Sequence, residues 1–196
     1  MPGITTAVGA DHTRILGLGV YRPERVVPNS EIIGPIDSSD EWIQTRSGIK
    51  ERRFAGDHET IVSMSVEASK QALAASELTA DQIDCVVLAT SSMMVLGPSA
   101  GAVVATELGM SDCPAFDVSA GCAGFCHALS TASDMVRAGT AQHVLVIGVE
   151  RLTDLLDPTD RSTAFIFADG AGAAAIGPSE VEGIGRVAWG SDGSQT

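Results

Sequence analysis

The residue best suited to chemistry is Cys122, which lies in the segment Ser-Ala-Gly-Cys-Ala-Gly-Phe at positions 119–125. The apolar run 114–118 before it predicts a buried strand, and an apolar periodic stretch continues after it to Arg137. The small residues permit a sharp turn from strand to helix, and a helix N-terminus favours the thiolate, the nucleophilic form of cysteine. Two interpretations stay open on these residues alone: a nucleophile at a strand-to-helix turn, or a cysteine that fills space in the core.

The composition narrows the class of protein. Hydrophobic residues make up 44% of the 196 residues and aromatic residues only 4%, which predicts a core of Ala, Val, Ile and Leu between helices and a sheet. The formal charge of -13 argues against a nucleic-acid partner. No signal peptide and no stretch long enough to cross a bilayer is recognisable, so we expect a cytoplasmic protein without a membrane partner.

The four cysteines lack the spacing of a disulfide framework, and we expect reduced thiols at Cys85, Cys113, Cys122 and Cys126. The run from Cys122 to His127 has one residue too many for a haem-attachment motif. It also offers too few ligands for a metal, so we predict neither.

The elements that must position Cys122 alternate along the chain. Strands are predicted at 14–21, 85–90, 114–118 and 143–150, and helices at 41–46, 59–75, 99–108 and from Cys122 to Arg137. This order predicts an α/β layered fold with a mainly parallel sheet flanked by helices and antiparallel strands toward the end. Segments 163–168 and 173–177 are predicted as two closing strands around a tight glycine turn at 169–172, which is not a dinucleotide site.

Cationic residues near the first helix are open to two interpretations. Trp42 and Arg46 lie four residues apart on one helical face, where the ring either shields the arginine stem or forms an aromatic plate for a nucleotide or phosphate. Ordinary packing is the interpretation that the residues alone favour. Lys50, Arg52 and Arg53 form a basic cluster, either a solvated face or a docking patch for an acidic partner.

Several segments together resemble the β-ketoacyl-acyl carrier protein synthase III family. The matching stretches run in family order through the chain, and the most specific are Phe-Asp-Val-Ser-Ala-Gly-Cys-Ala-Gly-Phe at 116–125 and Ser-Asp-Glu-Trp at 39–42. The others are residues 21–27, 45–49, 157–161 and 167–172. The resemblance implies the thiolase fold and a homodimer.

The resemblance also assigns roles to residues. Cys122 matches the nucleophile that takes an acyl group from acyl-CoA and passes it to a carbanion made by decarboxylating malonyl-acyl carrier protein. Trp42 and Arg161 match the positions that sandwich the adenine of coenzyme A, and Ser38 and Arg46 match others on the coenzyme A rim. The coenzyme A thioester is then a substrate, no cofactor is bound permanently, and the packing interpretation of Trp42 and Arg46 is reversed.

The sequence departs from the family pattern in two respects. Gly97 stands where a bulky Phe closes the acyl pocket across the dimer, which predicts a roomier pocket for branched or longer primers. The family's His and Asn, which stabilise the oxyanion and promote decarboxylation, match nothing here. Residues 1–196 are therefore predicted to be the N-terminal thiolase-like half and a little more, with exposed apolar faces. A non-condensing acyltransferase and a catalytically silent half that only binds coenzyme A or carrier protein are the alternatives.

Overall fold

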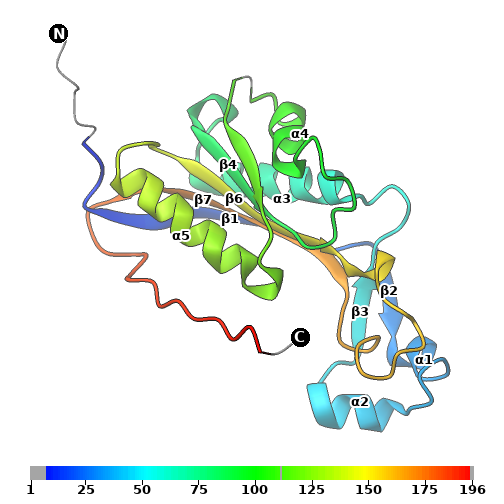
Figure 1. Ribbon diagram of the computed structural model, residues 1–196. Helices are drawn as coiled ribbons and strands as arrows, with labels where there is room; N and C mark the ends of the chain where they lie inside the picture. The colour runs from blue at the N-terminus through cyan, green and yellow to red at the C-terminus, as the bar shows by residue number, and fades with distance from the viewer. Residues whose placement is uncertain (1–7, 111, 195–196) are drawn as a thin grey trace.

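A five-stranded sheet forms the centre of the computed structural model, which describes residues 8–110 and 112–194 (Figure 1). The strands are β1 (His12–Tyr21), β7 (Asp169–Ser179), β6 (Val144–Arg151), β4 (Cys85–Ala89) and β5 (Ala115–Val118), in that spatial order. β4 pairs in parallel with β5 and β6, whereas β7 pairs antiparallel with β6 and β1. The predicted α/β fold with parallel central strands and an antiparallel finish is confirmed.

Helices cover both faces of the sheet (Figure 1). Val86 and Leu88 of β4 pack with α3 (Ile61–Ser76) and α4 (Ala100–Glu107), whereas Cys85 and Val87 pack with α5 (Gly124–Arg137). Successive side chains of a strand point to opposite faces, so a strand buried on both faces must be apolar throughout. The continuous apolar run of β4 meets this requirement.

A smaller subdomain lies beyond one end of the sheet (Figure 1). It contains the antiparallel pair β2 (Arg25–Pro28) and β3 (Glu51–Phe54), the helices α1 (Asn29–Ile32) and α2 (Asp40–Ser47), and part of the Arg161 loop, as we name residues 155–168. Three short 3-10 turns complete the elements at Ala80–Gln82, Gly121–Ala123 and Leu152–Asp154. The subdomain has its own apolar core, made of Val27, Ile32, Ile36, Ile43, Ala164 and Phe165. Two segments far apart in the sequence therefore share one core.

The predicted glycine turn between two closing strands is wrong. Residues 163–166 form turns and residues 167–168 are irregular, whereas residues 169–172 already belong to β7, where Gly170 and Gly172 pair with Glu150 and Gly148 of β6. A Cβ added at Gly170 would lie 3.2 Å from the carbonyl oxygen of Tyr21. Gly170 therefore permits the backbone of β1 to approach β7 closely, which is a common reason for glycine in a strand.

Apolar side chains are exposed along the outer strand β1, notably Leu18 and Val20. This agrees with the expected apolar surface, and whether a further part of a protein covers it stays a prediction. Within the described ranges 8–110 and 112–194, no helix combines the length and apolar character needed to cross a membrane.

Candidate active site

Cys122 lies where the chain turns from β5 into α5. The 3-10 turn Gly121–Ala123 joins them, Gly121 has the left-handed φ of 52°, and α5 starts at Gly124. A Cβ at Gly124 would lie 3.2 Å from the Cβ of Ala89, so the helix start packs against the end of β4. This is the predicted strand-to-helix turn, and the Cys122 side chain is exposed rather than buried. The space-filling interpretation of this cysteine is therefore wrong.

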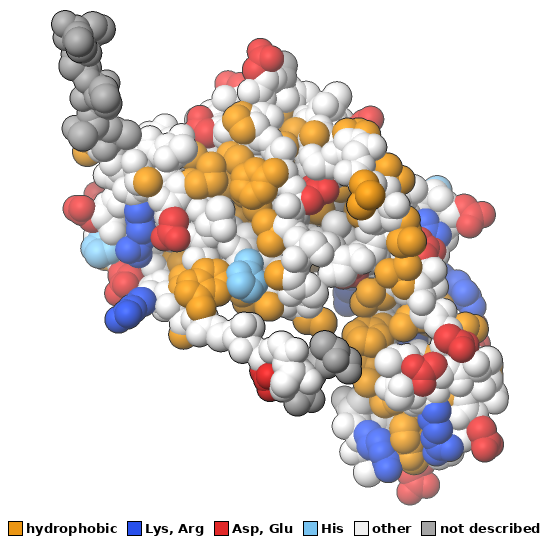
Figure 2. Space-filling view, in the orientation of Figure 1, with side chains coloured by type: hydrophobic (Ala, Val, Ile, Leu, Met, Phe, Trp, Pro, Cys, Tyr) orange, Lys and Arg blue, Asp and Glu red, His pale blue; other side chains and the backbone are white. Residues whose placement is uncertain are grey.

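A hollow of about 390 Å³ opens beside Cys122. Its walls come from the carboxyl ends of β4 and β6, the first residues of β7, the start of α5 and the end of the Arg161 loop, and the lining includes Ala89, Phe125, Glu150, Phe167 and Asp169. The carboxyl ends of parallel strands are the usual place for ligands in an open α/β sheet. Figure 2 shows the surface hollowed between the part of the molecule that holds the sheet and the small subdomain.

Two carboxylates in the wall of this hollow hold neighbouring loops. Glu150 accepts hydrogen bonds from the Ser91 N–H (2.9 Å) and the Ser92 hydroxyl (2.5 Å). Asp169 accepts from the Ala55 N–H (2.7 Å) and from the N–H and hydroxyl of Thr153 (3.0 and 2.6 Å). Sequence reasoning did not identify either residue as part of the site. Their places at the end of β6 and the start of β7 were the available signal.

Three of the predicted coenzyme A residues lie together in the small subdomain. The guanidinium carbons of Arg46 and Arg161 lie 4.1 and 4.8 Å from the centre of the Trp42 ring, although Arg161 comes from a distant part of the chain. The Phe165 ring meets Trp42 edge-on, with ring centres 5.1 Å apart. An aromatic plate next to cations suits a planar, anionic nucleotide.

The Arg161 loop is held by its own polar groups and by the segment between α1 and α2. The Arg161 guanidinium donates to the Asp37 carbonyl oxygen at 2.7 Å. Asp160 accepts hydrogen bonds from the hydroxyl groups of Thr163 and Ser162 and from the Ser162 N–H at 2.8 Å, and these hydrogen bonds, that from Thr163 foremost, lower the pKa of its carboxyl. The fourth predicted residue, Ser38, follows Asp37, and its hydroxyl is buried without a hydrogen-bond partner.

The predicted basic cluster is only partly a surface feature. Lys50 is exposed, but the Arg52 side chain is buried at 6% exposure, and Arg53 donates to the carbonyl oxygens of Pro23 and Glu24. The interpretation of Arg52 as part of a solvated or docking face is therefore wrong. Alternation along β3 turns its side chain into the subdomain core.

Gly97 lies in the exposed loop between β4 and α4 and does not line the hollow beside Cys122. A Cβ at this position would meet no atom within 4 Å. Met94, Val95 and Leu96 before it are also exposed, so none of these three side chains fills space near Cys122 within the described part of the chain. The effect of Gly97 on a pocket shared with a second subunit stays a prediction.

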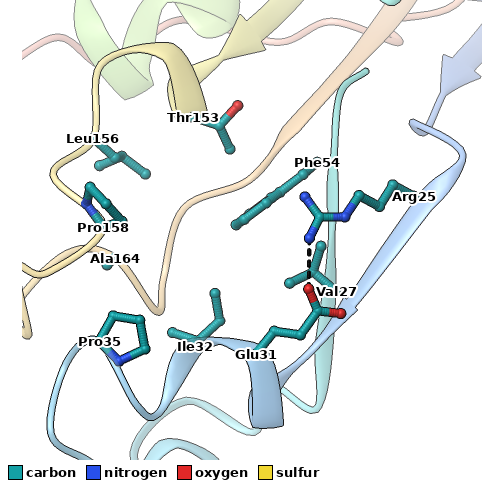
Figure 3. A pocket seen from close by; sticks show the side chains of 10 residues that line it. All are labelled: Arg25, Val27, Glu31, Ile32, Pro35, Phe54, Thr153, Leu156, Pro158 and Ala164. Atoms are coloured by element: carbon teal, nitrogen blue, oxygen red, sulfur yellow. Dashed lines mark hydrogen bonds and ion pairs between the residues drawn. The ribbon is translucent and has the colours of Figure 1, made fainter. Parts of the chain in front are cut away.

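A smaller cavity of about 220 Å³ lies within the small subdomain (Figure 3). Phe54 and Val27 of the β2–β3 pair form one side, and Leu156, Pro158 and Ala164 of the Arg161 loop form the other. The ion pair between Arg25 and Glu31, at 2.6 Å, is the charged part of an otherwise largely apolar lining. The cavity contains neither Cys122 nor Trp42, so it is separate from the two predicted groups of site residues.

Comparisons with known proteins agree on one family. Residues 116–193 match the family model described as 3-Oxoacyl-[acyl-carrier-protein (ACP)] synthase III. The whole chain is 51% identical over 195 residues to the mycobacterial β-ketoacyl-[acyl-carrier-protein] synthase III of Mycobacterium marinum, and covers 58% of it. It is 53% identical over 195 residues to β-ketoacyl-[acyl-carrier-protein] synthase III 1 of Streptomyces avermitilis, and covers 55% of it.

Solved structures show the same relationship. The priming β-ketosynthase of the R1128 polyketide biosynthetic pathway superposes with a TM-score of 0.95 at 49% identity, over 98% of this chain and 57% of that one. The 3-oxoacyl-(acyl carrier protein) synthase III of Pseudomonas aeruginosa superposes with a TM-score of 0.85 at 37% identity, over 94% of this chain and 58% of that one. The chain thus spans somewhat more than half the length of these relatives. Over its whole length it is homologous to the β-ketoacyl-[acyl-carrier-protein] synthases III, and its fold is the thiolase-like fold of that family.

Proposed function

We propose that this chain forms the acyl-accepting part of a β-ketoacyl-acyl carrier protein synthase III, an acyltransferase that begins fatty-acid or polyketide synthesis. The observation that carries the proposal is the exposed Cys122 at the start of α5, beside a hollow at the carboxyl ends of β4 and β6. The homology to synthases of this name and to a priming β-ketosynthase supports it.

In the first step, the Cys122 thiolate attacks the carbonyl carbon of an acyl-CoA thioester. The bond from that carbon to the coenzyme A sulfur breaks, coenzyme A leaves as its thiolate and takes up a proton, and the acyl group stays on the Cys122 sulfur. The N-terminal end of α5 contributes positive potential near the reacting sulfur. Trp42, Arg46 and Arg161 stack on the adenine and neutralise phosphate charge, with Ser38 at the rim. Coenzyme A is a substrate in this scheme, and no cofactor is bound permanently.

In the second step, malonyl-acyl carrier protein loses carbon dioxide, and its carbanion attacks the acyl-Cys122 carbonyl carbon. The product is a 3-oxoacyl-acyl carrier protein, and the Cys122 thiolate is released. The family resemblance assigns oxyanion stabilisation and decarboxylation to a His and an Asn that match no position in residues 1–196. Condensation is therefore proposed for a protein that also supplies these groups, acting in the cytoplasm as a homodimer.

The test is uptake of an acyl group by Cys122. The purified protein is mixed with acetyl-CoA or isobutyryl-CoA, and the intact mass is measured before and after the reaction. We expect a gain of one acyl group that Cys122→Ala abolishes and that alkaline hydroxylamine reverses, since a thioester is cleaved by that reagent. Cys126→Ala is the matched control, because Cys126 is also an exposed thiol and lies four residues away.

The same experiment separates the alternatives. A second stage adds an acceptor to the loaded protein, and transfer of the acyl group without loss of carbon dioxide would indicate a non-condensing acyltransferase. Binding of coenzyme A without any loading of Cys122 would contradict the proposal and identify a catalytically silent half.

A further inference from the structure

Arg52 of β3 is a buried cation without a carboxylate partner in the described part of the chain. Its side chain is 6% exposed, and none of the ion pairs formed there includes it. Its guanidinium donates to the Val27 carbonyl oxygen (3.2 Å), the Asn29 side-chain oxygen (2.8 Å) and the Phe165 carbonyl oxygen (3.0 Å). All three acceptors are neutral, and the Arg52 Nε has no partner.

Such a group does not improve stability by being charged. Removing a charge from water has a large free-energy cost, and well-packed apolar residues of similar volume often replace buried ionic groups without loss of stability. Burial lowers the pKa of Arg52 from its ordinary value. What the guanidinium does supply is a planar fork of donors with fixed directions.

One branch of this fork leads to α2. Asn29, which accepts from Arg52, donates through its side-chain nitrogen to the Asp40 carboxylate and to the Ile49 carbonyl oxygen, both at 2.7 Å. Asp40 is the first residue of α2, the helix that carries Trp42 and Arg46. The position of this helix is thus connected to Arg52 through a buried hydrogen bond to Asn29 and a partly buried one from Asn29 to Asp40.

The other branch leads to the Arg161 loop. Arg52 donates to the backbone of Phe165, whose ring contacts Trp42, and Arg161 lies four residues earlier in the same loop. On the Arg25 side of the subdomain a cavity lies between this loop and the β2–β3 pair (Figure 3). Apolar packing is therefore incomplete between loop and strands, and the hydrogen bond from Arg52 to Phe165 is a specific connection across them.

We infer that Arg52 is a positioning residue for the coenzyme A site, which holds the two segments that carry Trp42 and Arg161 in place by hydrogen bonds toward each of them. The inference rests on the proposed function only in naming coenzyme A as the ligand. Arg52 touches neither Trp42 nor Arg161 directly, and it acts through Asn29 and Phe165.

The kinetic test compares two thioesters in loading of Cys122. Acyl-CoA carries the nucleotide that the Trp42 site binds, and the acyl N-acetylcysteamine thioester lacks it. For Arg52→Met we expect KM for acyl-CoA to rise roughly 10-fold or more, as for loss of hydrogen bonds to a charged group, with kcat little changed. Loading from the truncated thioester should stay near the wild-type rate. Arg52→Lys, which restores the charge but not the planar fork, should be intermediate.

A merely structural role would move both substrates together, so a parallel loss with acyl-CoA and the truncated thioester overturns the inference. An unchanged KM for acyl-CoA overturns it as well. Lys50→Met is the matched control, because it removes an exposed cation two residues away, and it should leave both reactions unchanged. If Arg52→Met fails to fold by circular dichroism, the comparison is made with Arg52→Lys.

A second readout does not depend on activity. The chain has two tryptophans, so Trp189→Phe leaves Trp42 as the single tryptophan emitter. In that background Arg52→Met should increase quenching of Trp42 by iodide and shift its emission to the red. An unaltered Trp42 spectrum overturns the inference even if Cys122 loads normally. Failure of the wild type to load Cys122 would instead contradict the proposed function and leave the Trp42 result to decide the role of Arg52.

Discussion

The guanidinium carbon of Arg161 lies 4.8 Å from the centre of the Trp42 ring, so no planar base fits between the two side chains as they stand. A base between them needs two stacking contacts of about 3.5 Å each, or about 7 Å in total. Binding of adenine in the proposed site therefore requires Arg161 to move outward. Arg161 is tied to the Asp37 carbonyl oxygen by one exposed hydrogen bond, which a short movement can break.

The first prediction concerns Trp42. Stacking of a base on an aromatic side chain is worth about 1–3 kcal/mol by alanine substitution, so Trp42→Ala should raise KM for acyl-CoA by roughly 5-fold to 150-fold. Loading of Cys122 from the N-acetylcysteamine thioester should not change, since that substrate has no base. The measurement is the initial rate of acyl transfer to Cys122 at varied substrate concentration.

Trp189→Ala is the control for this prediction. Trp189 is 57% exposed and stacks on His127, with ring centres 4.3 Å apart, away from the Trp42 group. Its removal should leave KM for acyl-CoA unchanged. Equal effects of the two substitutions would contradict the assignment of Trp42 to the nucleotide.

The second prediction concerns the reactivity of the four free thiols. Burial and the neighbouring Cys113 and Asp84 raise the pKa of the Cys85 thiol to about 11, and burial also raises the pKa of Cys113. Since the thiolate is the reactive form, iodoacetamide at neutral pH should modify the exposed Cys122 and Cys126 well before Cys85. Intact mass followed by peptide mapping measures the order. Early labelling of Cys85 would contradict the packing of β4.

The turn at Cys122 and the fold class are the features that the sequence predicts best. The turn at Cys122 follows from small residues between an apolar strand and a periodic helix, all of them close in sequence. The fold class follows from the order of such local elements, and β4 is identified by its apolar run alone. In contrast, the spacing of Trp42 and Arg46 alone favours ordinary packing, because Arg161, the second cation on the Trp42 ring, is distant in the chain.

Long-range hydrogen bonds explain most of what the sequence did not predict. Arg52 looks like part of a basic surface cluster until its contact with Phe165, 113 residues away, is known. Glu150 lines the hollow at the end of β6, but its hydrogen bonds to Ser91 and Ser92 join residues that are far apart in the sequence. The sequence predicts a turn at the start of β7 because glycine is common both in tight turns and where neighbouring strands approach closely, and only the pairing of Gly170 with Glu150 distinguishes the two cases.

The third prediction concerns Tyr21 and Glu59, which connect β1 to the segment before α3. Glu59 is 2% exposed and accepts from the Tyr21 hydroxyl (2.8 Å), the Glu24 N–H (2.9 Å) and the Gly56 N–H (2.7 Å). Burial alone would raise the pKa of the Glu59 carboxyl, but these hydrogen bonds hold it below its ordinary value. The hydrogen bond to Glu59, with burial and nearby carboxylates, raises the pKa of Tyr21 to about 12.

Glu59 and Tyr21 make the free energy of unfolding depend on pH in opposite directions. The contribution of Glu59 is present above its ordinary pKa of about 4.3 and is lost as the pH falls through its lower folded value. The contribution of Tyr21 is present below about pH 10 and is lost as the pH rises toward 12.

Tyr21 is the single tyrosine of the chain, so its absorbance titration is unambiguous. Glu59→Gln should bring the pKa of Tyr21 back toward 10 and lower the free energy of unfolding by about 1–3 kcal/mol. An unchanged titration would contradict the hydrogen bond.

The last prediction concerns Gly97 and the size of the acyl pocket. The resemblance places a ring from this position in the acyl pocket of the partner subunit, and here a Cβ meets no atom within 4 Å, so Gly97→Phe should be tolerated by the fold. We expect wild-type protein to load isobutyryl and longer acyl groups from coenzyme A readily. In the dimer, Gly97→Phe should lower their loading relative to acetyl by about 10-fold or more, because added bulk rejects larger groups.

Val95→Phe adds a ring to the same exposed loop and serves as the control, with no change in acyl-chain preference expected. Strict acetyl preference of the wild-type protein, or an unaltered profile in Gly97→Phe, would show that the lost side-chain volume at Gly97 does not set primer size.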